Sequence, residues 1–141
     1  MTRRSNAVTS TGYAPDFDID NRRGVVGERL FGTFLEELAR GTIEVKTDYG
    51  AWETGNHYVE TAQQGADGEW RRSGINATQA DWWCVAGPVG AGFVCISVAE
   101  LKKLCMTAPQ AEQPIRGNRS NPTKGRLVKM ADIVAAVMAQ Q

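Results

Sequence analysis

The chain has 141 residues, of which 42% are hydrophobic and 23% charged, and this is the size and composition of one soluble globular domain. Sixteen basic and sixteen acidic residues give a net charge of zero. That balance excludes a global attraction to nucleic acid, so any such binding needs a local basic patch. No apolar run is long enough to span a membrane and no signal peptide is evident, so we expect no membrane association and a cytoplasmic location.

The cysteines and the single histidine limit the kinds of functional site that this chain can form. Cys84, Cys95 and Cys105 are odd in number and stand in apolar surroundings, which predicts reduced thiols in the core of a cytoplasmic protein. There is no C-x-x-C spacing, and His57 is the only histidine. We therefore expect neither a structural zinc site nor a Ser-His-Asp triad.

The N-terminal part contains one predicted helix. Residues 1–15 are small and polar, and we expect them to be flexible. Apolar residues at helical spacing then predict a helix from about Val25 to Ala39. Glu28 lies at the edge of its apolar stripe, where a carboxylate needs a partner. It is either a functional acid or an edge residue that reaches water or pairs with an arginine.

A strand over residues 42–48 is the most informative stretch. Its side chains alternate between an apolar side for the core and a polar side, namely Ile43, Val45 and Thr47 against Glu44, Lys46 and Asp48. The polar side is either a solvated surface with an internal ion pair or part of a functional site. A loop over 49–55 and a second strand over 56–61 follow, which predicts an antiparallel hairpin. The hairpin would bring Glu60 beside the polar side, around one cleft.

In the middle of the chain, we expect an exposed segment followed by a partly buried one. We expect residues 63–72 to form an exposed loop or irregular strand, in which Trp70, Arg71 and Arg72 either contact a phosphate backbone or simply pack. Thr78 begins a pattern like a capping box, which predicts a short helix carrying two core tryptophans, Trp82 and Trp83.

The C-terminal third predicts one strand, two helices and a loop between the helices. Residues 93–96 read as a buried strand, and Ser97 begins a full capping box that opens the first of these helices. Residues 107–125 contain Arg116, Arg119 and Lys124 among prolines and glycines, which predicts a mobile basic loop or a plain linker. A last short helix is expected around residues 133–138.

The sequence Glu44-Val45-Lys46, preceded by a helix that carries Glu28, resembles the PD-(D/E)XK nuclease superfamily, which includes restriction enzymes and Holliday-junction resolvases. The blocks at 44–48, 54–60 and 73–83 are similar to small phage-type nucleases of that superfamily, and the resemblance spans about residues 20–105. It implies an α/β, restriction-endonuclease-like core over residues 1–141, with a mixed central sheet flanked by helices. It also implies that acidic residues hold Mg²⁺, with Mn²⁺ as an alternative, while the lysine orients the attacking water.

The resemblance implies most of the site residues but does not decide which residue is the first acid. Glu44 and Lys46 match the E-x-K pair, and Glu28 resembles the helix-borne acid of the resolvase branch. The superfamily also places an aspartate on a strand before E-x-K, and none lies between residues 20 and 44 here. Either Asp48 or Glu60 takes that role, or the site is degenerate. A second alignment makes Asp48 the first acid and Glu60 the second, with Lys46 on the neighbouring strand.

Three functions are therefore expected in order. The first is a Mg²⁺-dependent DNA endonuclease acting on junction or duplex DNA as a homodimer in a bacterial or phage-infected cell. Its DNA contacts would come from Arg71, Arg72, Arg116, Arg119 and Lys124. The second is a DNA-binding or assembly protein with a decayed site on the same fold, and the third is a structural protein whose acidic strand is merely solvated.

Overall fold

The computed structural model describes residues 28–29, 32–33, 35–113 and 121–139 of the chain. The chain divides into two compact units, residues 1–37 and 38–141. Every described residue of the helix predicted for 25–39 is helical, which confirms that prediction for those positions. The segment expected to be flexible, residues 1–15, lies outside the described residues.

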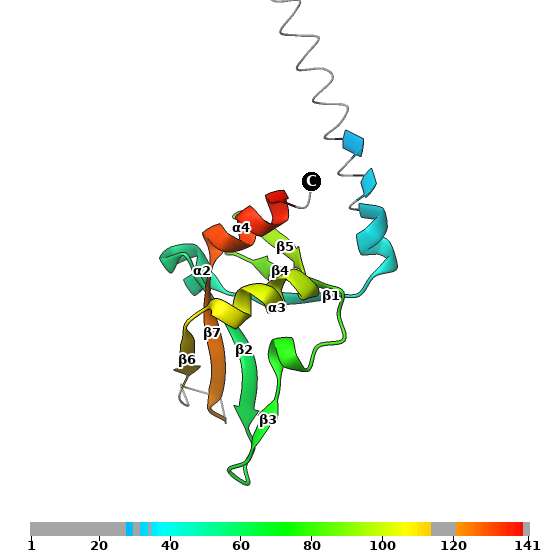
Figure 1. The fold of residues 1–141 in the computed structure, drawn as a ribbon. Helices are drawn as coiled ribbons and strands as arrows, with labels where there is room; N and C mark the ends of the chain where they lie inside the picture. The colour runs from blue at the N-terminus through cyan, green and yellow to red at the C-terminus, as the bar shows by residue number, and fades with distance from the viewer. Residues whose placement is uncertain (1–27, 30–31, 34, 114–120, 140–141) are drawn as a thin grey trace, which may run out of the picture. The chain divides into compact units, whose positions relative to one another are not determined.

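The second unit contains two β-sheets, drawn in Figure 1. In the first sheet, β1 (Ile43–Thr47) runs parallel to β4 (Trp82–Ala86), which pairs antiparallel with β5 (Phe93–Ser97). The second sheet is antiparallel, in the order β3 (Trp70–Arg72), β2 (Asn56–Gln64), β7 (Thr123–Lys129) and β6 (Gln110–Gln113). The protein is mixed α/β, as predicted, but its strands are divided between two sheets.

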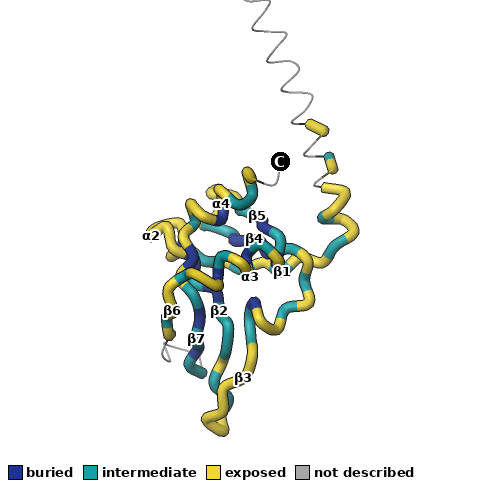
Figure 2. The backbone as a smooth tube through the Cα atoms, viewed as in Figure 1, coloured by how far each residue is buried: buried dark blue, intermediate teal, exposed yellow. Residues whose placement is uncertain are grey.

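The core forms where helices meet both sheets. Helices α3 (Val98–Thr107) and α4 (Met130–Ala139) pack against each other and against β5 and β7. The largest buried apolar side chains are Trp83, Ile75, Ile96, Leu101 and Ile133. Figure 2 shows burial concentrated around β4 and the adjoining part of β7, whereas β3 is exposed. No described helix has both the length and the apolar character needed to cross a membrane.

The predicted hairpin between the strands at 42–48 and 56–61 is wrong. Residues 49–54 form a helix, α2 (Tyr49–Thr54), where a loop was expected. Asp48 caps its first turn through a hydrogen bond from the Ala51 amide, and Gly55 ends it in the left-handed region at φ 76°. Because this helix separates the strands, β1 pairs with β4 in one sheet and β2 with β7 in the other.

The predicted helix after Thr78 is also wrong, because residues 82–86 form β4. Their aromatic and β-branched side chains suit the centre of a sheet, and β4 is paired on both sides. The Thr78 hydroxyl instead accepts a hydrogen bond from the Ala80 amide. The other capping prediction is confirmed, since Ser97 Oγ accepts the Glu100 amide at the start of α3.

Further along, the strand at 93–96 and the final helix are confirmed as β5 and α4. The loop predicted for 107–125 is only partly a loop. It contains β6 and the beginning of β7, which pair with each other antiparallel. Residues 114–120 lie outside the described part of the chain.

The cysteine prediction needs one correction. Cys84 and Cys95 form a disulfide with an S–S distance of 2.00 Å, rather than two reduced thiols. The register explains the bond, because β4 and β5 place these residues directly opposite each other with Cα atoms 4.2 Å apart. Cys105 is a free, buried thiol, as predicted, and burial raises its pKa to about 11.

Candidate functional site

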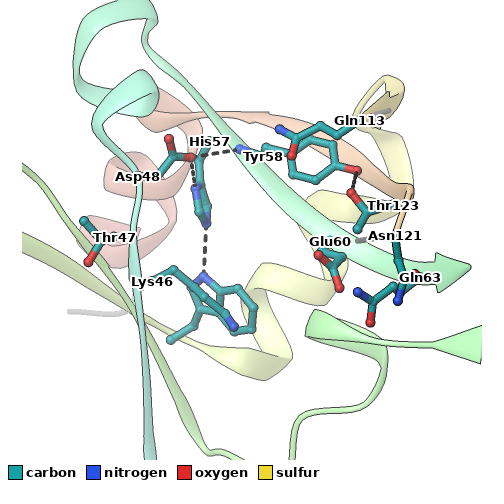
Figure 3. Close-up of a pocket in the computed structure, with 11 residues that line it drawn as sticks. Lys46, Thr47, Asp48, His57, Tyr58, Glu60, Gln63, Gln113, Asn121 and Thr123 are labelled. Atoms are coloured by element: carbon teal, nitrogen blue, oxygen red, sulfur yellow. Dashed lines mark hydrogen bonds and ion pairs between the residues drawn. The ribbon is translucent and has the colours of Figure 1, made fainter. Parts of the chain in front are cut away.

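A pocket of about 450 Å³ lies in the second unit, between the end of β1 and one face of the β2–β7 sheet (Figure 3). Among the residues lining it are Lys46, Asp48, His57, Tyr58, Glu60 and Thr123. Three of the predicted site residues, Lys46, Asp48 and Glu60, therefore share one cavity although their strands do not pair. Glu44 joins them through its ion pair with Lys46.

The polar side of β1 faces inward, which reverses the expected orientation of this strand. Ile43, Val45 and Thr47 are exposed, Val45 at 61%, whereas Glu44 and Lys46 between them are only partly exposed. The register explains the reversal, because Glu44 lies opposite Trp83, whose side chain is fully buried. The apolar side, expected to enter the core, is the one exposed within the described residues.

Lys46, which lines the pocket, forms an ion pair with Glu44. Lys46 Nζ lies 2.5 Å from Glu44 Oε1. Burial opposes ionisation of Glu44, but hydrogen bonds from Lys46 and Thr78 outweigh it, so the pKa of Glu44 is lowered from its ordinary value. Glu44 is thus a carboxylate at neutral pH, and both side chains are partly open to solvent.

Asp48 is held by three hydrogen bonds from the protein. Its Oδ1 accepts the Ala51 amide at 3.0 Å, and its Oδ2 accepts His57 Nδ1 at 2.7 Å and the Tyr58 amide at 3.2 Å. Figure 3 shows the contacts of Asp48 with His57 and Tyr58. Asp48 is therefore a helix cap that also fixes the beginning of β2 beside the pocket.

His57 is fully buried, and both of its ring nitrogens have partners. The indole Nε1–H of Trp83 donates to His57 Nε2 at 3.1 Å. Because Nε2 is an acceptor there, the ring proton is on Nδ1 and is donated to Asp48. Burial lowers the pKa of His57 despite the neighbouring Asp48 carboxylate, so the ring is neutral at physiological pH. It is a structural link rather than an available base.

Glu60 is the acidic residue on the opposite wall of the pocket. Its Oε1 accepts a hydrogen bond from Ser73 Oγ at 2.6 Å. The next residue, Gly74, has φ 50°, and a Cβ atom at this position would overlap the Glu60 backbone. A glycine is required for this close approach. The Ser73-Gly74 turn thus braces Glu60 at its backbone and at its carboxylate.

Sequence reasoning missed the residues that build the remaining wall. The Tyr58 hydroxyl and Thr123 Oγ1 are 3.0 Å apart, and a Cβ atom on Gly125 would lie 2.6 Å from Tyr58 Cζ. Trp83 was expected only in the core. A buried histidine needs hydrogen-bond partners, but no pattern in the sequence identifies Trp83 as the partner of His57.

Not every predicted site residue belongs to this pocket. Glu28 is an exposed helical residue of the N-terminal unit, and the site described here is built from the second unit alone. Across the described residues, no three His, Cys, Asp or Glu side chains cluster closely enough to hold a metal ion by themselves. The carboxylates among the residues that line the pocket are those of Asp48 and Glu60.

The predicted basic residues differ in their surroundings. Arg71 is bound through both guanidinium ends to Asp67, at 2.9 and 2.5 Å, which holds the pKa of Asp67 at about 2. Lys124 lies over the Trp70 ring at 4.1 Å, and Arg72 is exposed on the same strand as Trp70. Arg116 and Arg119 lie outside the described residues.

A search for relatives of this chain found no matching family model, curated protein or solved structure.

Proposed function

We propose that this protein is a Mg²⁺-dependent endonuclease that hydrolyses phosphodiester bonds in DNA. The observation that carries the proposal is that Lys46, Asp48 and Glu60 line one open pocket. Two carboxylates and an ammonium are the groups that metal-assisted phosphodiester hydrolysis needs. The inward orientation of the polar side of β1 favours this function over that of a strand with a merely solvated acidic face.

The donor set at the pocket suits Mg²⁺. This ion is usually held by one or two carboxylates, with water and substrate phosphate as its other ligands. Asp48 and Glu60, which both line the pocket, would supply such a pair, and this favours the alignment in which these two residues are the first and second acids. When bound, the ion would polarise the phosphate and lower the pKa of a water molecule.

Within this proposal the remaining groups stabilise the reacting atoms or hold the site residues in place. Lys46 presents an ammonium that can hold a water molecule or a developing oxyanion. Glu44 fixes that ammonium through the 2.5 Å ion pair, and Ser73 fixes the Glu60 carboxylate. The resemblance to junction resolvases and phage nucleases extends the proposal to branched or duplex DNA, with a homodimer providing one site for each strand.

A cleavage assay with junction, duplex and single-stranded DNA tests this function. We expect cleavage in Mg²⁺ or Mn²⁺ and none in EDTA. Glu60→Gln keeps the size and the Ser73 partner but removes the charge, so it should weaken Mg²⁺ binding in calorimetry with DNA present. Glu112→Gln, on β6 and outside the lining of this pocket, is the control. Absence of any Mg²⁺ or Mn²⁺ heat from the wild-type protein with DNA would reject a nuclease.

A DNA-binding or assembly protein without catalysis is the second candidate. It is favoured by the fact that each carboxylate here already has a protein partner: Lys46 for Glu44, His57 for Asp48 and Ser73 for Glu60. This candidate predicts DNA binding that is indifferent to EDTA and no cleavage of any of the three substrates.

A further inference from the structure

Trp83 lies directly beneath the lysine of the proposed site. The Lys46 ammonium is 5.2 Å from the centre of the Trp83 ring, within the range of a cation–π interaction. Trp83 is fully buried, and it pairs in register with Glu44, the ionic partner of the same lysine. Lys46 therefore has two neighbours of different kinds, a partly exposed carboxylate and a buried aromatic ring.

The Trp83 ring is fixed because its polar end is anchored. Its Nε1–H donates to His57 Nε2, and His57 Nδ1–H donates to Asp48 Oδ2. Asp48 is in turn held by the amides of Ala51 and Tyr58. A continuous chain of hydrogen bonds thus runs from the first turn of α2 to the ring under Lys46. No buried side-chain polar atom among the described residues lacks a partner, so the chain is fully satisfied.

The two neighbours of Lys46 differ in how easily they can be displaced. Glu44 is partly exposed and ionised, so a cation or a water network that engages its oxygens competes directly with the ammonium. The Trp83 face cannot rotate away, because its N–H would lose a buried hydrogen bond. A lysine held by Glu44 alone would move as soon as that carboxylate took another partner.

We propose that Trp83 is a positioning residue for Lys46. The indole, locked by His57 and Asp48, keeps the ammonium at the pocket when Glu44 is engaged elsewhere. The consequence for turnover rests on the proposed nuclease function, whereas the contact itself does not.

The contact can be tested in the wild-type protein without any activity. The chain has five lysines, at positions 46, 102, 103, 124 and 129, so ¹H–¹³C spectra with labelled lysine are simple to assign. Ring currents should move the Lys46 side-chain protons upfield relative to Lys103, which lies on α3 and is ion-paired with Glu100. Lys124, over Trp70, provides an internal reference for a lysine above an indole.

The shift should survive the loss of the ionic partner. In Glu44→Gln, and in wild type with Mg²⁺ and DNA analogue added, Lys46 should remain upfield. A Lys46 signal at the position of Lys103 in the wild-type protein would overturn the inference. So would an upfield signal that disappears in Glu44→Gln, because the carboxylate would then be the positioning group.

Kinetics test the consequence. Trp83→Phe keeps a ring but loses the N–H that anchors it, so kcat should fall by about tenfold or more with KM little changed. Trp82→Phe alters the adjacent residue, whose side chain alternates to the opposite face of β4, and should leave kcat and the Lys46 signal unchanged. His57→Gln keeps an acceptor for the indole and a donor for Asp48, and should retain more activity than His57→Leu.

The outcomes separate this inference from the proposed function. If wild type cleaves no DNA, the nuclease proposal fails and the Lys46 spectra still decide the contact. If wild type cleaves and Trp83→Phe shifts the Lys46 signal while keeping full kcat, the positioning role is overturned. If Trp83→Phe does not fold, the wild-type and Glu44→Gln spectra and the two His57 variants decide it.

Discussion

His57 illustrates how one buried residue connects the fold to the pocket. It is the only histidine in the chain, and its ring bridges Asp48 on one side and Trp83 on the other. Protonation would place an N–H donor on both nitrogens, leaving the Trp83 N–H without an acceptor. The pocket therefore depends on a neutral ring.

This arrangement predicts a pH-dependent stability. Burial lowers the pKa of His57 in the folded state below its ordinary value of 6.5, which the unfolded chain retains. Between those two values the unfolded state binds more protons. The contribution of His57 to the free energy of unfolding should therefore be constant above about pH 6.5. It should decrease as the pH falls below that value. Urea unfolding between pH 7.5 and 5.5 measures this, and His57→Gln should show a shallower decrease. An equal decrease in both proteins would contradict the assignment.

Gly74 is the second residue whose role is set by geometry. Its φ is positive and a side chain would meet the Glu60 backbone. Gly74→Ala should lose roughly 1–3 kcal/mol of stability from backbone strain, with a further loss from the clash. Gly68→Ala is the matched control, since Gly68 also has positive φ but faces open space. Equal losses of stability in the two variants would show that Gly74 does not brace Glu60.

Among the elements, those determined by local chemistry were predictable from the sequence. The helix after Ser97, the strand at 93–96 and the final helix all carry their own caps or apolar patterns. The elements that were missed depend on distant partners. Residues 82–86 become a central strand because β1 and β5 pair on either side of them, and no local pattern records that pairing.

In the candidate site, too, the features set by local sequence were predictable and those set by distant partners were not. Lys46, Asp48 and Glu60 were identifiable as charged residues on strand faces, and they do share a pocket. The inward orientation of β1 was not predictable, because it depends on Trp83 lying opposite Glu44 in a parallel pairing between distant segments. The roles of Asp48 as a cap and of His57 as a link also require the α2 turn to be known.

The side-chain cap of helix α3 leads to a prediction about stability. Ser97→Ala removes the side-chain acceptor for the Glu100 amide and should destabilise the protein by about 1 kcal/mol, with cleavage unchanged. Thr78→Ala removes a turn hydrogen bond and a contact with Glu44 rather than a helix cap. Thermal unfolding and cleavage rates of both variants measure this difference. A large loss of activity in Ser97→Ala at unchanged stability would contradict its structural role.

At the scale of the whole molecule, zero net charge means that the proposed DNA binding would have to come from local features. Arg72 and Lys124 lie on β3 and β7 of the second sheet, with Trp70 beside Lys124. Arg71 is already occupied by Asp67 in a two-point ion pair. The basic surface of the described residues is thus narrower than the sequence suggested.

Salt dependence tests that surface. Replacing Arg72 and Lys124 with alanine should weaken DNA binding and reduce the slope of log affinity against log salt by about 2, since each phosphate contact releases close to one counterion. The double variant Lys102→Ala/Lys103→Ala removes the same charge from α3 and should leave the slope unchanged. Fluorescence anisotropy across a salt series measures both. Equal changes in the two double variants would mean that these contacts are not local.

The central claim is that the pocket around Lys46 performs the chemistry. The direct measurement compares cleavage and DNA affinity of wild type and Lys46→Ala in Mg²⁺, with Lys103→Ala as the control. Because the lysine is asked to serve the transition state, Lys46→Ala should abolish cleavage while DNA affinity is retained. Full cleavage by Lys46→Ala, or loss of cleavage that only parallels loss of DNA binding, would contradict the assignment of this pocket as the active site.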